Sequence, residues 1–132
     1  MTVGVLLVTH DHIGDAMIHA TSVILGVCPL EIKTLHIPFD DVDPDDLLNE
    51  ADKLVRSLEK GDGVLVLTDM FGATPSNIAH RLVGDSHVKV VTGLNLPMLM
   101  RIMNYPNLNI NELVDKALTG GREGIIINRR SP

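Results

Sequence analysis

The chain has 132 residues, which is typical of one domain and long enough to bury a core without disulfides. Hydrophobic residues make up 45% and charged residues 21%, a composition that excludes an intrinsically disordered chain. The net charge of -6 and the aromatic content of 2% argue against a nucleic-acid partner, which needs a basic surface or stacked rings.

The first residues and the cysteine content bear on location. The single cysteine, Cys28, excludes an intramolecular disulfide and a metal site built on paired cysteines. The apolar run at residues 1–8 has no basic segment and is too short for a signal peptide or a membrane span. We therefore expect a soluble, cytoplasmic protein that does not insert into a membrane.

The first half of the chain alternates strand and helix patterns. Residues 3–8 form a short apolar run typical of a strand buried on both faces, and helical spacing follows over 16–27. Residues 30–37 predict a second strand. Asp43 and Pro44 then predict a helix start, and an apolar stripe continues to Leu58.

The second half repeats the alternation. Residues 63–68 predict a third strand, Thr74 and Pro75 a capped helix start, and residues 87–92 a fourth strand. Residues 96–103 have helical spacing. Asn109 and Glu112 resemble a capping box that opens a helix ending at Gly120-Gly121. Residues 124–127 predict a last short strand, and residues 128–132 a tail.

This alternation predicts an α/β fold, a doubly wound sheet of four parallel strands in the order 2-1-3-4, in a single domain over residues 1–132. In that order the first and third strands are neighbours. Ligands of such sheets bind in the crevice beyond the carboxyl ends of these two strands.

A histidine and a carboxylate follow those two strands. His10 comes after the first strand, and Asp69 directly after the third. The backbone amides of Gly72, Ala73 and Thr74 could face the crevice as an anion cradle, aided by the helix dipole. This set predicts a phosphoryl site. In it, Asp69 accepts a hydrogen bond from the protonated Nδ1 of His10, which leaves Nε2 as the nucleophile. Each residue also has an ordinary alternative: His10 as a loop residue, Asp69 as a turn cap and Thr74 as a helix N-cap.

Four sequence blocks identify a family resemblance that spans essentially the whole chain. They are LLVTH at 6–10, VLVLTDMFGATPSNIA at 64–79, VVTGLNLPMLM at 90–100 and TGGREGIII at 119–127. In this order they resemble the enzyme IIA domain of the mannose family of the bacterial phosphoenolpyruvate-dependent sugar phosphotransferase system.

The resemblance implies a site, a mechanism and an assembly. It implies that His10 is phosphorylated at Nε2 and that Asp69 is hydrogen-bonded to it, with no metal or cofactor. It implies a homodimer in which the C-terminal strand is exchanged between subunits as an antiparallel edge of the sheet. The implied donor is the histidine phosphocarrier protein, and the implied acceptor is an enzyme IIB partner.

The sequence departs from the family pattern in the loop after the third strand. The usual G-G-S-P-F-N is here GATPSN, at residues 72–77. Alanine in place of glycine restricts the backbone where the cradle is expected, and Thr74 adds a methyl group to the usual serine. Family members that serve a sugar permease are often fused to an enzyme IIB domain. For this chain, a role in transport and a regulatory role both stay open.

A group of metal-ligand side chains lies near the predicted start of the first helix. It comprises His10, Asp11, His12, Asp15 and His19. Its H-x-H-x-x-D spacing only partly resembles the H-x-H-x-D-H of binuclear zinc hydrolases, whose other ligands are missing. A solvated helix start explains His12 and His19, so we expect no metal.

We therefore predict a phosphotransferase component that accepts a phosphoryl group on His10 and passes it on, for sugar uptake or regulation. One alternative is a receiver-like signalling domain phosphorylated on Asp69 with Mg²⁺. Such a domain would want an acidic pair after the first strand and a lysine after the last, where this chain has His10-Asp11 and Asn128-Arg129. The other alternative is a binding regulator controlled by phosphorylation of His10.

Overall fold

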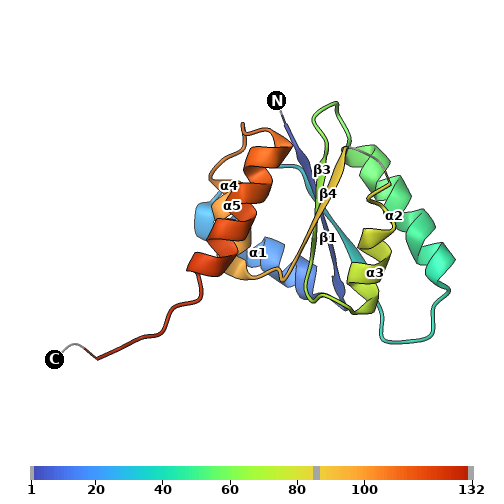
Figure 1. Cartoon of the computed structure of the whole chain (residues 1–132), viewed down its shortest axis with the longest axis horizontal. Helices are drawn as coiled ribbons and strands as arrows, with labels where there is room; N and C mark the ends of the chain where they lie inside the picture. Colours follow the sequence, from blue (N-terminus) through green and yellow to red (C-terminus); the bar gives the residue numbers. More distant parts are fainter. Residues whose placement is uncertain (1, 85–86, 131–132) are drawn as a thin grey trace.

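A parallel four-stranded sheet forms the centre of the protein (Figure 1). The computed structural model describes residues 2–84 and 87–130. The sheet has the order β2-β1-β3-β4, which confirms the predicted order. Its strands are β1 (Gly4–His10), β2 (Ile32–Ile37), β3 (Val64–Thr68) and β4 (Val88–Thr92).

In the described part of the chain, five helices cover the two faces of the sheet (Figure 1). One face carries α1 (Ile13–Leu25), α4 (Leu96–Met103) and α5 (Ile110–Glu123), and the other carries α2 (Pro44–Leu58) and α3 (Thr74–His80). Successive strand side chains point to opposite faces, so Leu7 and Leu67 join the first helical layer, and Leu6 and Val66 join the second. Burial on both faces explains why the strands read as continuous apolar runs.

The strand β1 runs two residues beyond its apolar run. Thr9 and His10 pair with His36 and Ile37 of β2, so His10 is the last residue of the strand. His10 and Asp69 therefore lie at the carboxyl ends of two neighbouring strands, β1 and β3.

Two of the predicted helix starts are confirmed and one is wrong. The Asp43 carboxylate accepts from the Asp45 amide with Pro44 at the first helical position, and the Asn109 side chain accepts from the Glu112 amide. Thr74, by contrast, lies inside α3. The N-cap of α3 is Ala73, whose side chain cannot cap, and Pro75 fixes the backbone of the first turn.

The helix α5 does not end at Gly120-Gly121. It continues to Glu123, and its glycines allow close contact with α4. A Cβ at Gly120 would lie 2.4 Å from Arg101 Cβ, and a Cβ at Gly124, just after the helix, would lie 2.2 Å from Pro97 Cβ. Gly120 and Gly121 thus serve helix packing, whereas Gly124 is both the C-cap residue of α5 and a contact of Pro97.

The segment after α5 leads away from the body of the protein (Figure 1). Ile125, Ile126 and Ile127 are each at least 74% exposed, and residues 124–127 form no strand in the single chain. The predicted edge strand requires a second subunit, so it stays a prediction. The predicted tail at 128–132 lies partly outside the described residues. None of the described helices is long and apolar enough to cross a membrane.

Candidate functional site

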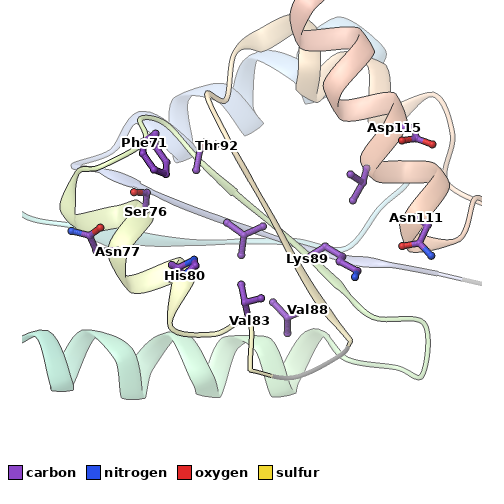
Figure 2. A pocket seen from close by; sticks show the side chains of 12 residues that line it. Phe71, Ser76, Asn77, His80, Val83, Val88, Lys89, Thr92, Asn111 and Asp115 are labelled. Carbon is purple, nitrogen blue, oxygen red and sulfur yellow. The ribbon is translucent and has the colours of Figure 1, made fainter.

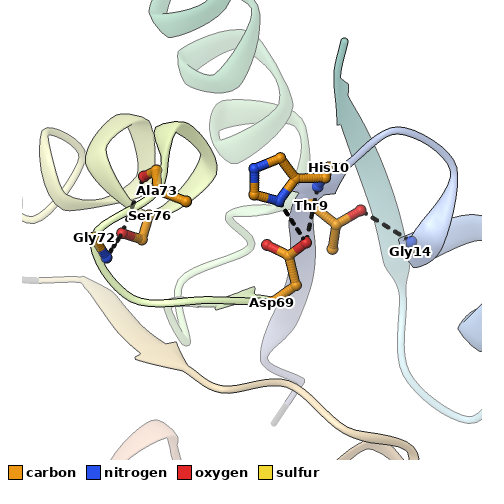
Figure 3. Close-up of polar contacts among 7 residues, drawn as sticks. All are labelled: Thr9, His10, Gly14, Asp69, Gly72, Ala73 and Ser76. Atoms are coloured by element: carbon orange, nitrogen blue, oxygen red, sulfur yellow. Dashed lines mark hydrogen bonds and ion pairs between the residues drawn. The ribbon is translucent and has the colours of Figure 1, made fainter. Parts of the chain in front are cut away.

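The structure joins His10 and Asp69 at the carboxyl ends of β1 and β3 (Figure 3). Oxygen Oδ2 of Asp69 lies 2.8 Å from Nδ1 of His10 and accepts the backbone N–H of His10 at 3.0 Å. The side chains are 20% and 12% exposed, so the pair lies at the floor of the site and is partly open to solvent. The predicted neighbourhood of these two residues is confirmed.

The contacts of Asp69 determine which ring nitrogen of His10 carries the proton. A carboxylate is only an acceptor, so Nδ1 donates its hydrogen to Asp69. The two hydrogen bonds to one oxygen fix both the backbone and the ring of His10. Nitrogen Nε2 is left with its lone pair, which is the tautomer that a nucleophilic histidine needs.

The ring of Phe39 lies against the ring of His10. The ring centroids are 5.6 Å apart and the planes are within 14° of parallel. Phe39 lies two residues after the end of β2 and is 78% exposed. Both residues line a cavity of about 290 Å³, together with Thr74 at the start of α3.

The loop after Asp69 is organised by Ser76. The amide of Gly72 donates to Ser76 Oγ at 2.9 Å, and Ser76 Oγ donates to the carbonyl of Ala73 at 3.2 Å (Figure 3). The Gly72 amide of the expected cradle is therefore already engaged, whereas Thr74 shares the cavity with His10. Gly72 has φ +82°, which favours glycine, but Ala73 has an ordinary extended backbone with φ -93°. Alanine in place of the family's second glycine therefore introduces no strain.

Two residues to which the sequence assigned no role position the start of α1. The hydroxyl of the buried Thr9 accepts the amide of Gly14 at 2.9 Å and so caps an unpaired N–H of the helix (Figure 3). Asp11 adopts φ +46° and turns the chain from β1 into α1, a conformation that aspartate tolerates better than most residues. In the sequence, the available signal for this role of Thr9 was a threonine directly after an apolar strand pattern.

A second polar cluster lies between α1 and β2. Asp15 Oδ2 is 3.3 Å from Nδ1 of His12 and 2.8 Å from Nε2 of His36, and Thr34 Oγ1 donates to Asp15 Oδ1 at 2.6 Å. The Thr34 hydrogen bond, opposed by a small desolvation effect and aided by both histidines, lowers the pKa of Asp15 below its usual range. The sequence grouped Asp15 with His19, but the structure brings it to His36.

The outer edge of β4 borders a large cavity. This cavity, of about 820 Å³, lies between α3 and α5 and opens over β4 (Figure 2). Val88, Val90 and Thr92 of β4 line it, with Phe71 and Val83 on one side and Val114 on the other. Within residues 2–84 and 87–130, β4 pairs only with β3, so its outer backbone groups are available to another strand.

The sequence is similar to those of known proteins. The profile of the EIIA-man family, described as "PTS system fructose IIA component", matches residues 4–118. The chain is 33% identical over 114 residues to the sorbose-specific EIIA component of the phosphotransferase system of Lacticaseibacillus casei, covering 83% of this chain and 79% of that protein.

A longer relative matches over the whole chain. The mannose-specific EIIAB component of Escherichia coli K12 is 27% identical over 135 residues, which covers 100% of this chain. The chain spans only 41% of the length of that relative.

Solved structures share the fold. The mannose/sorbose-specific IIA subunit from Enterococcus faecalis superposes with a TM-score of 0.88 at 22% identity, covering 100% of this chain and 98% of that one. The EIIA component from Streptococcus agalactiae superposes with a TM-score of 0.79 at 28% identity, covering 95% and 96%.

Proposed function

The chain belongs to the EIIA-man family of phosphotransferase-system IIA components, and on that premise we propose that it carries a phosphoryl group on Nε2 of His10. The observation that carries this proposal is the 2.8 Å contact between His10 Nδ1 and Asp69 Oδ2. The family description names fructose and the relatives are named for mannose and sorbose, so the proposal concerns the transfer and assigns no sugar.

The proposed reaction is an in-line transfer between two histidines. The Nε2 lone pair of His10 attacks the phosphorus atom of a phosphohistidine on the donor. The Nε2–P bond forms while the donor's N–P bond breaks, and that electron pair returns to the donor's ring. The proton on Nδ1 stays hydrogen-bonded to Asp69, whose negative charge stabilises the positive charge that develops on the ring.

Asp69 also has an opposing influence on the product. A phosphoryl group brings nearly two negative charges, which a nearby carboxylate repels. The pair therefore favours formation of the N–P bond and also keeps that bond easy to break. This balance suits a carrier, which must both gain and lose the group.

Two partners must reach His10 in turn. We propose that the donor is the histidine phosphocarrier protein and the acceptor an enzyme IIB protein, both in the cytoplasm. Large apolar side chains close in sequence to the ends of β1, β2 and β3 are exposed: Ile13, Phe39, Met70 and Phe71. Because both partners use the same surface one after the other, we expect small, transient interfaces.

The proposed assembly is a homodimer with an exchanged C-terminal strand. The exposed isoleucines at 125–127 and the unpaired edge of β4 are complementary, since one supplies an apolar strand and the other an open edge beside a cavity. Such an exchange would cover both, and it is a common route to symmetric dimers.

The receiver-like alternative is less consistent with the geometry. A receiver needs a free carboxylate on Asp69 and acidic partners that hold Mg²⁺. Here Asp69 accepts two hydrogen bonds from His10, and Asp11 lies with its Oδ1 3.8 Å from Nε2 of His12. These contacts favour Asp69 as the partner of His10 over Asp69 as the phosphoryl acceptor.

Incubation with the phosphorylated histidine phosphocarrier protein tests the proposal. The wild type should gain one phosphoryl group that is lost in acid and stable in base, and His10→Ala should gain none. His12→Ala is the matched control and should gain the group as the wild type does. A group that is labile in base, or one that His10→Ala retains, would contradict the proposal.

A further inference from the structure

The cluster between α1 and β2 has the donor set of a metal site. We infer that His12, Asp15 and His36 bind one divalent cation of the zinc type. The three candidate ligand atoms all lie within 4.8 Å of one another. His36 comes from β2, so spacing along the sequence could not reveal it as a ligand, and the sequence alone predicts no metal here.

The distances are close to those that a bound ion requires. Zinc-to-ligand bonds of about 2.0–2.1 Å place tetrahedral ligand atoms about 3.3 Å apart. Asp15 Oδ2 lies 3.3 Å from His12 Nδ1 and 2.8 Å from His36 Nε2. Small rotations of the two imidazole rings, whose centroids are 4.3 Å apart, would complete the geometry.

The three residues have fixed backbone positions on α1 and β2 before an ion binds. His12 is the N-cap residue of α1 and Asp15 lies in its first turn, whereas His36 lies within β2 and pairs with Thr9. Thr34, two residues before His36 on the same face of β2, donates a 2.6 Å hydrogen bond to the outer oxygen of Asp15. This contact orients the carboxylate, as partners of metal-binding carboxylates commonly do.

The chemistry of the ligands selects the class of cation. Two imidazoles and one carboxylate suit Zn²⁺, Co²⁺, Ni²⁺ or Cu²⁺, whereas Mg²⁺ and Ca²⁺ prefer oxygen ligands. The side chains are 68%, 45% and 40% exposed, so an ion can enter from solvent. Three protein ligands leave at least one coordination position for water or another ligand.

Cobalt binding tests the site on protein without a polyhistidine tag. Titration with Co²⁺ should give one ion per chain and the visible absorption of a low-coordinate cobalt centre. Zn²⁺ should displace the cobalt, and excess Mg²⁺ should not. Zn²⁺ should also raise the midpoint of thermal unfolding, because it binds the folded state.

Variants locate the ion. His36→Ala should weaken Co²⁺ binding by more than the roughly 10- to 100-fold typical of a lost outer partner, and Thr34→Val by about that range. His19→Ala, on the same helix but outside the cluster, is the matched control and should bind as the wild type does. No stoichiometric cobalt binding, equal competition by Mg²⁺, or unchanged affinity in a folded His36→Ala would overturn the inference.

Discussion

Asp69 is the residue whose substitution distinguishes a positioning role from a turn cap. We expect Asp69→Asn to fold and to gain phosphate more slowly, because asparagine can accept the Nδ1 hydrogen but lacks the charge that stabilises the ring. By analogy with another histidine–aspartate pair, the loss could approach 10⁴-fold, about the value for a serine protease. Rapid-quench measurement of phosphoryl transfer from the phosphorylated donor gives this rate.

Asp62→Asn is the matched control for that variant. Its carboxylate also accepts a backbone N–H, from Thr2, but at the opposite end of the sheet. It should transfer at the wild-type rate. If Asp69→Asn gained phosphate as fast as Asp62→Asn, Asp69 would be a turn-capping residue and the mechanism for it would be wrong.

Phe39 should orient the ring of His10 without being needed for the fold. Stacked aromatic pairs contribute about 0.5–1.5 kcal/mol, so Phe39→Ala should slow the gain of phosphate by roughly 2- to 10-fold. Phe39→Tyr keeps the ring and should transfer normally. Equal rates for the alanine variant and the wild type would show that the stacking has no role in transfer.

The sequence could predict His10 and Asp69 but not their surroundings. His10 ends β1 and Asp69 follows β3, and the strand order alone brings such positions together. The roles of Phe39, Ser76 and His36 depend on loop conformation and on contacts between separate elements, which no local pattern encodes. The hydrogen bond from Gly72 to Ser76 is the clearest example, because it engages an amide that the sequence assigned to a phosphoryl cradle.

The contact between α4 and α5 accounts for the glycines near the end of α5. A Cβ at Gly120 would meet Arg101 Cβ at 2.4 Å, which requires the helices to move apart. We expect Gly120→Ala to lower the free energy of unfolding by about 1–2 kcal/mol, since overpacking outweighs the gain of about 1 kcal/mol in helix propensity. Denaturant unfolding measures the change.

Gly84→Ala provides the control for this prediction. A Cβ at Gly84 would meet nothing within 4 Å. Its free energy of unfolding should stay within about 0.5 kcal/mol of the wild type. A Gly120→Ala variant as stable as Gly84→Ala would mean that α4 and α5 can separate without cost.

The starts of α2 and α5 were easier to predict from the sequence than the end of α5. Asp43 and Asn109 cap their helices through their own side chains, so the local sequence carries the signal. Gly120 and Gly121 read as a stop because glycine commonly follows a helix. Their real role is to let another helix approach, and that contact involves residues about 20 positions earlier in the chain.

The quaternary structure gives a prediction at the scale of the whole molecule. Removal of residues 125–132 keeps α5 intact but takes away the exposed isoleucines. We expect this variant to sediment as a monomer, because it lacks the apolar strand that would join the subunits of the proposed dimer. Removal of residues 128–132 alone is the control and should leave the dimer. A stable dimer after the longer deletion would show that the segment is dispensable.

The overall architecture was the most predictable part of the molecule. Four apolar runs separated by helical patterns leave few connections that are short and right-handed, and the observed sheet order β2-β1-β3-β4 is one of them. The C-terminal segment could not be derived in the same way. Its partner in the proposed dimer is another chain, so the single sequence shows an apolar run without showing what covers it.

The position of the phosphoryl group on the ring of His10 tests the central claim most directly. Protein labelled with ¹⁵N and phosphorylated by the histidine phosphocarrier protein can be examined by ¹H–¹⁵N–³¹P NMR. Because Asp69 Oδ2 holds Nδ1 at 2.8 Å, the account predicts phosphorus coupling to Nε2 of His10 and a proton retained on Nδ1. Phosphorus on Nδ1 of His10, or on His12 or Asp69, would contradict it.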